Sequence, residues 1–154
     1  MKEIYRAAGS LNRGFVGQIA YTVCLEEEFR KLDIHFSFDP EKRRYTPEEI
    51  TDEFVEENLQ LVKEKYGLAG TPEAMRGALL REGKTELHVM AELNGEFIGC
   101  VHKQLDDRHM VFDGDFASEG CLPQEKIGGV LRVTILAFNV IKDDTGYQLE
   151  VSAE

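Results

Sequence analysis

Two helix signatures follow one another directly in this sequence, and strand patterns lie on both sides of them. Thr46-Pro47-Glu48-Glu49 has the composition of a helix start, because Thr can cap free amides, Pro suits the first helical position and Glu49 can reach back to the cap. Thr71-Pro72 begins a second such segment, and Gly67 and Gly83 stand where the two helices should end. We therefore expect a helix of about five turns followed by a shorter one.

Alternation of apolar and polar residues with period 2 predicts strands before and after the helices. The clearest case runs from Leu32 to Phe38, where each second residue is large and apolar. Asn94-Gly95 supplies the two residues that a tight hairpin turn prefers. The other predicted strands are Phe15–Cys24, Leu87–Leu93, Phe97–Gln104, His109–Phe112, Val130–Ile141 and Tyr147–Val151.

The resulting order, ββααβββββ, predicts an α+β fold. We expect a mainly antiparallel sheet of about seven strands, either open or barrel-like, with the two consecutive helices on one face or at one end. Hairpins should join most of the strands. The 154 residues contain no repeat or linker, so residues 1–154 are expected to form a single domain.

The charge balance excludes some classes of partner. The formal net charge is −11, from 18 basic and 29 acidic residues, which disfavours nucleic acid and anionic membrane surfaces. The first ten residues carry no apolar stretch of the kind a secretion signal needs, and the three cysteines form no pair pattern. These features predict a cytoplasmic protein with reduced thiols, of which Cys121 is the one to test for reactivity.

Common catalytic and cofactor motifs are absent from the sequence. It contains no glycine-rich phosphate loop, no Gly-x-Ser-x-Gly and no His-Glu-x-x-His. We therefore expect no cofactor and no metal site, and we favour a protein that is not an enzyme.

The strongest candidate for chemistry is the segment from Asp106 to Asp115. If it stays extended, His109, Asp113 and Asp115 point to one side, where they could act as acid and base or hold a divalent cation. The alternative is that Asp106-Asp107 and Asp113-Gly114-Asp115 are simply turns.

A second candidate is His102, because a two-residue turn at Asn94-Gly95 would place it opposite Leu87 at the end of an apolar cross-strand face. There His102 could bind a ligand, and Met90 and Phe138 are further ligand-binding candidates. The alternative is that His102 is an ordinary histidine at the edge of the core.

Several strands are apolar on both faces, including the run around Leu136 and Phe138. Such strands must be covered on both sides, by a cavity for an apolar or amphipathic small molecule or by a second subunit. We therefore expect a non-enzymatic binding or regulatory module, with a small ligand or a homodimer face on its sheet. The alternatives are a small hydrolase- or isomerase-type enzyme using His109 with Asp113 and Asp115, or His102, and an interaction protein with an acidic helix.

Overall fold

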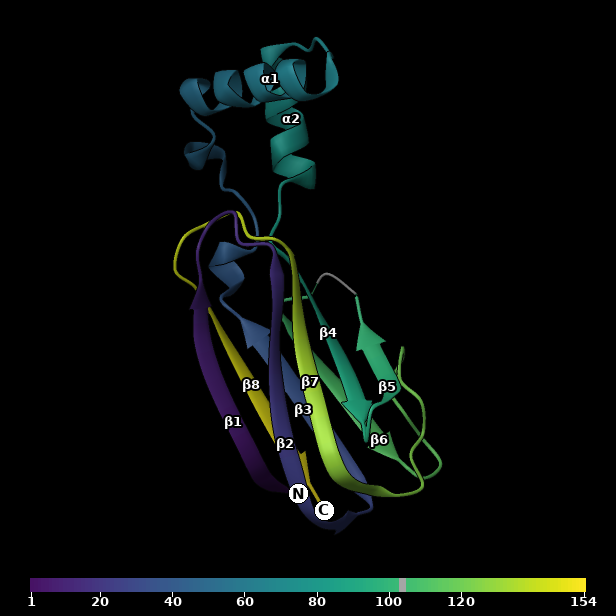
Figure 1. Cartoon of the computed structure of the whole chain (residues 1–154). Coiled ribbons are helices and arrows are strands. Elements are labelled where there is room, and N and C mark those ends of the chain that lie inside the picture. The colour runs from purple at the N-terminus through teal and green to yellow at the C-terminus, as the bar shows by residue number, and fades with distance from the viewer. Residues whose placement is uncertain (103–104) are drawn as a thin grey trace.

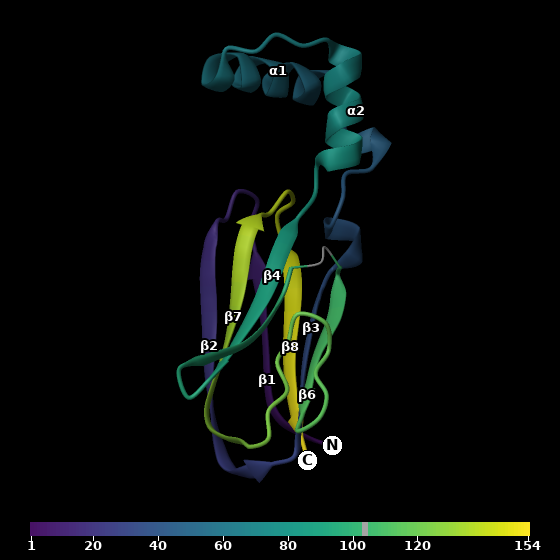
Figure 2. The same ribbon diagram turned by 90° about the vertical axis from the view of Figure 1, so that its right-hand side faces the viewer.

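The computed structural model describes residues 1–102 and 105–154, which form two antiparallel β-sheets that pack face to face (Figures 1 and 2). The first sheet has the strand order β1-β8-β3-β6 and the second has the order β2-β7-β4-β5. The strands are β1 (Lys2–Leu11), β2 (Gly17–Phe29), β3 (Lys31–Phe38), β4 (Glu86–Leu93), β5 (Glu96–Val101), β6 (Asp107–Asp113), β7 (Ile127–Asn139) and β8 (Thr145–Ala153).

The α+β class and the antiparallel sheets predicted from the sequence are confirmed, but the sheet is not closed into a barrel. The additional strand is β1, whose small and charged residues give no clear alternation. Its position at the edge of the first sheet, paired with β8, needs little apolar surface. The strand expected to end at Gln104 ends at Val101, and residues 103 and 104 lie outside the described residues.

Most connections cross from one sheet to the other, whereas hairpins were expected. Among the described residues, β4 and β5 are the one pair of consecutive strands that are also neighbours in a sheet. The strand predicted to end at Cys24 continues as β2 through a register shift to Phe29, and the chain then crosses at Arg30 to the first sheet. Stacking of the two sheets therefore satisfies the need to bury one face of each strand.

The core lies between the sheets and is built by alternation. Each second residue of β3, from Leu32 to Phe38, is at most 5% exposed, and the inward residues of β4 from Leu87 to Leu93 are buried in the same cluster. The intervening residues of both strands point outward. The outward residues are therefore the ones available for function.

Between β3 and β4 the chain forms two short 3-10 turns, η1 (Pro40–Lys42) and η2 (Pro47–Glu49), and the helices α1 (Asp52–Tyr66) and α2 (Pro72–Glu82). The expected helix start at Thr46 belongs to η2, where the amide of Thr46 donates to Glu49. The α-helix begins one turn later, because the hydroxyl of Thr51 accepts the amide of Phe54 at 3.1 Å. The expected helix ends at Gly67 and Gly83 are confirmed.

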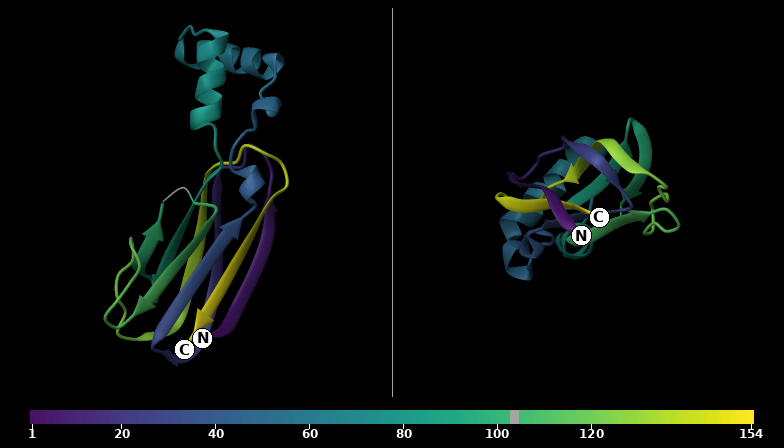
Figure 3. Two further views of the ribbon diagram at one scale, coloured as in Figure 1. Left: turned by 180° about the vertical axis from the view of Figure 1, so that it is seen from behind. Right: turned by 90° about the horizontal axis from the view of Figure 1, so that it is seen from below.

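The two helices project from one end of the sandwich and cover neither outer sheet face, as Figures 1 and 3 show. They pack on each other, with Arg76 of α2 bound to Asp52 at 2.6 Å. Leu61 of α1 is 56% exposed. The chain ends lie together at the opposite end of the sandwich, where Lys2 pairs with Ala153 (Figure 1). Among the described helices, none has the length and apolar character of a membrane span.

Candidate functional site

The register of the β4–β5 hairpin determines which residue of β4 lies opposite each residue of the returning strand. Asn94 and Gly95 have positive φ values of 54° and 84°, so the expected two-residue turn is present. A register shift after Ala91 then pairs Val89 with Val101. The expected pairing of Leu87 with His102 is therefore wrong, because this shift moves β5 by one residue relative to β4.

The outer face of the second sheet is rich in apolar side chains. We call it the second-sheet face, and define it by the outward residues Ala20, Thr22 and Cys24 of β2, Val130, Arg132, Leu136 and Phe138 of β7, His88, Met90 and Glu92 of β4, and Phe97 and Cys100 of β5. Three large apolar members are about half exposed: Val130 at 48%, Phe97 at 51% and Phe138 at 53%. Val130 and Phe97 lie near one end of this face and Phe138 near the other, and several exposed apolar side chains on one sheet face are typical of an interaction surface.

The charges within the second-sheet face balance each other. Glu92 and Arg132 are register partners on β4 and β7, and their side chains lie 3.9 Å apart. This pair is therefore formally neutral, whereas Glu86 lies at the edge of the face, 3.2 Å from His88, and the whole chain carries a net charge of −11.

The ligand-binding candidates His102, Met90 and Phe138 all lie on or beside the second-sheet face. The ring of His88 is 4.5 Å from that of Phe138 and 6.0 Å from that of His102, measured between centroids. His102 is exposed, and Met90 is half-buried between β5 and β7. They form part of an open surface rather than the lining of an enclosed cavity.

The outer face of the first sheet is polar, and it brings His109 next to a residue far away in the sequence. His109 of β6 lies directly opposite His35 of β3. Their rings stack with centroids 4.1 Å apart and planes 2° apart. The two histidines are 74 residues apart in the sequence. A signal was nevertheless present, because both occur in Asp-x-His triplets, Asp33-Ile34-His35 and Asp107-Arg108-His109.

The structure does not bring His109 together with Asp113 and Asp115. Asp113 lies four residues further along β6, about 13 Å away at the usual strand rise. One of its carboxylate oxygens accepts the backbone amides of Asp115 at 3.0 Å and Phe116 at 2.6 Å. This arrangement is the turn that the sequence left open as the alternative.

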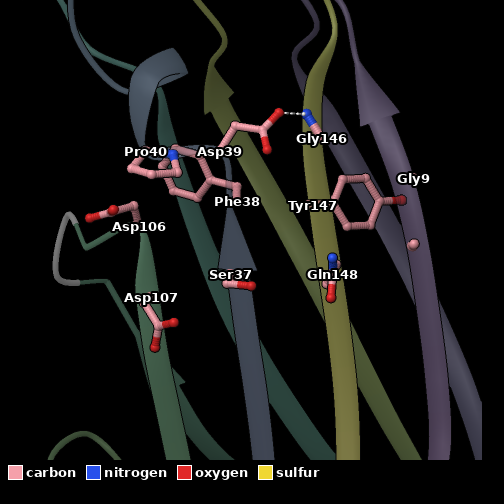
Figure 4. A pocket seen from close by; sticks show the side chains of 11 residues that line it. Gly9, Ser37, Phe38, Asp39, Pro40, Asp106, Asp107, Gly146, Tyr147 and Gln148 are labelled. Carbon is pink, nitrogen blue, oxygen red and sulfur yellow. Dashed lines mark hydrogen bonds between the residues drawn. The ribbon is translucent and has the colours of Figure 1, made fainter.

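A hollow of about 490 Å³ opens on the first sheet near the start of β6 (Figure 4). Two of the carboxylates around it hold the fold together: Asp39 accepts the amide of Gly146 at 2.8 Å, and Asp106 pairs with Arg43 at 3.1 Å. The part lined by β1, β3 and β8 combines the small residues Ala8, Gly9, Ser37 and Gly146 with Phe38, Tyr147 and Gln148, and it carries no charged side chain. We assign no binding role to this hollow.

Burial makes two of the cysteines weak nucleophiles. It raises the pKa of the Cys100 thiol and that of the Cys121 thiol, although Ser118, 3.7 Å from Cys121, acts in the opposite direction. A raised pKa leaves little thiolate near neutral pH. Cys121, the candidate for reactivity, packs against the core beside Gly99.

Comparison with known proteins yields one match. The model of a family described as of unknown function (DUF6669) matches residues 1–154. No curated protein and no solved structure shows a significant match.

Proposed function

The chain belongs to this family of unknown function, and on that premise we propose that it is a non-enzymatic binding module that forms a homodimer through the second-sheet face. The carrying observation is the set of half-exposed apolar residues Val130, Phe97 and Phe138 on one sheet face. Burying about 100 Å² of apolar surface contributes about 2.5 kcal/mol to the free energy of association, so the burial of several such side chains favours dimer formation.

A second copy is the partner that suits the charges of this surface. Two chains of net charge −11 repel one another. Glu92 and Arg132 balance each other within the second-sheet face, so two copies that approach through this pair bring no excess of like charge together there. In a two-fold arrangement the same surface patch serves on both sides. Arg132 of one copy can then lie against Glu92 of the other.

The size of the face is at the lower end of the range for a specific dimer. Four strands about 4.8 Å apart and the segment from Val130 to Phe138 define a footprint of about 400 Å² in projection. Side-chain relief increases the accessible area, so the two copies together would bury roughly 1,000 Å² or somewhat more. We therefore expect a reversible dimer whose population depends on concentration.

We propose that the protein is located in the cytoplasm, a reducing compartment, because Cys24, Cys100 and Cys121 are all free thiols. It includes no catalytic step, since the acid–base set of His109 with Asp113 and Asp115 is not assembled. Neither nucleic acid nor a membrane is proposed as a partner, given the acidic charge balance.

The test compares two phenylalanines that are equally exposed. Phe138 lies on the second-sheet face and is 53% exposed, whereas Phe116 follows β6 and is 55% exposed. Sedimentation velocity over a range of protein concentrations should show a monomer–dimer equilibrium for the wild-type chain. Phe138→Glu should raise the dissociation constant more than about tenfold, because burying a charge in place of an apolar side chain is costly. Phe116→Glu should leave the equilibrium unchanged. A wild-type chain that is monomeric throughout, or equal effects of both substitutions, would overturn the proposal.

A further inference from the structure

The two Asp-x-His triplets meet across β3 and β6. Because the strands are antiparallel and His35 pairs with His109, each aspartate lies diagonally beside the histidine of the other strand. Nε2 of His35 is 3.2 Å from both carboxylate oxygens of Asp107, and Nδ1 of His109 is 3.0 Å from both oxygens of Asp33. Two imidazoles and two carboxylates therefore form one compact group on the outer face of the first sheet.

We propose that His35, His109 and Asp107 bind a divalent transition-metal ion of the zinc type. One ligand atom from each of these side chains lies within 4.8 Å of those of the other two. A tetrahedral ion with bonds of about 2.0–2.1 Å needs ligand atoms about 3.3 Å apart. The donors that lie farthest apart must therefore approach by at most about 1.5 Å, and the stacked rings must turn their edges toward one point. The side chains of His109 and Asp107 are 49% and 64% exposed, which leaves them room to rotate.

The remaining carboxylates are placed to orient the ligands. Asp33 accepts a hydrogen bond from Nδ1 of His109, which leaves Nε2 of that ring for the metal. On the other side, Glu150 of β8 is 3.8 Å from Nδ1 of His35 and is itself paired with Arg6 at 3.0 Å. Each histidine thus has a carboxylate beside the nitrogen that would not bind the ion, as in many protein metal sites.

The ligand set selects a class of metal. Imidazole nitrogens favour Zn²⁺, Ni²⁺ and Cu²⁺, whereas Mg²⁺ and Ca²⁺ prefer oxygen ligands alone. With three protein ligands on an exposed sheet face, water would complete the coordination. The site lies on the first sheet and the proposed dimer face lies on the second, so either proposal can fail without the other.

Isothermal titration calorimetry of the untagged protein with Zn²⁺, and separately with Mg²⁺, tests the site. We expect one Zn²⁺ per chain and no binding of Mg²⁺. His109→Ala and Asp107→Asn should each lower the Zn²⁺ affinity at least about tenfold, and Asp33→Asn should lower it about tenfold to a hundredfold. Urea unfolding of each variant should show that the fold is retained, which is expected because His109 and Asp107 are exposed.

Two controls separate this site from other donors on the surface. His102 is an exposed histidine beside the second-sheet face, and Cys24 is an exposed thiol on β2. His102→Ala and Cys24→Ser should leave Zn²⁺ binding unchanged. The proposal is overturned if the wild-type chain fails to bind Zn²⁺ at about 1 mM, if His109→Ala binds with wild-type affinity, or if either control loses binding to the same extent as His109→Ala.

Discussion

Replacing Arg108 with Met should destabilise the protein, because Arg108 fastens the two sheets together. Its side chain is 4% exposed and points from β6 of the first sheet toward the second. Nη1 donates to the carbonyl of Leu87 at 2.7 Å and to that of Val101 at 3.4 Å, and Nη2 donates to the carbonyl of Leu105. The guanidinium also lies 5.5 Å from the centre of the Phe36 ring.

The expected size follows from two opposing contributions. Hydrogen bonds from a charged group contribute about 1.5–3 kcal/mol each, so two good bonds and one long one contribute about 5 kcal/mol. Burial of the cation acts against them. It lowers the pKa of Arg108 from 12.5 to about 10, which corresponds to at most about 3 kcal/mol. Met removes both contributions and leaves buried carbonyls without a donor, so we expect a loss of about 2–4 kcal/mol.

Urea unfolding followed by circular dichroism measures this change. Arg30, an exposed arginine between β2 and β3, is the matched control, and Arg30→Met should alter the free energy of unfolding by less than about 0.5 kcal/mol. All variants are compared at one protein concentration, since dimer formation adds to the apparent stability. If the free energy of unfolding of Arg108→Met lies within about 1 kcal/mol of the wild-type value, the hydrogen bonds of Arg108 do not stabilise the packing of the two sheets.

Two further substitutions test local details of the fold. Thr51→Ala should lower the free energy of unfolding by about 1 kcal/mol, because it removes the cap on the Phe54 amide. Thr46→Ala should lower it by less, because Thr46 caps only a 3-10 turn. Equal losses in urea unfolding would contradict the assignment of the start of α1 to Thr51. Gly9→Val should lower the melting temperature by several degrees, because a Cβ there overlaps the ring of Tyr147; an unchanged melting temperature would contradict the close packing of β1 on β8.

The sequence predicted elements whose patterns are local. The alternation in Leu32–Phe38 determined both the strand and its buried face, and Thr71-Pro72 determined the start of α2. It could not reveal β1, where a register shift between Glu3 and Tyr5 and the small residues Ala7 and Gly9 interrupt the alternation that marks a strand. It could not reveal the shift after Ala91 either, since one extra residue changes a register without leaving a composition signal.

The candidate sites depend on contacts between distant residues. His35 and His109 are register partners only because β3 and β6 are neighbours in the first sheet, and no local pattern determines strand order. The second-sheet face was predictable in part. The two-faced character of β7, with Leu136 and Phe138 outward, implied that a second surface needed cover. The stacked sheets cover the inner surface and leave this outer one exposed.

Charge reversal on the second-sheet face tests the proposed homodimer most directly. Arg132→Glu replaces the Glu92–Arg132 pair by two negative charges, and Glu92→Arg replaces it by two positive charges. Each variant alone should be monomeric in sedimentation velocity, because like charges then meet across the interface. An equal mixture of the two should form dimers at least as readily as the wild-type chain. Variants that dimerise alone as the wild type does, or a mixture that stays monomeric, would contradict the assignment of this face.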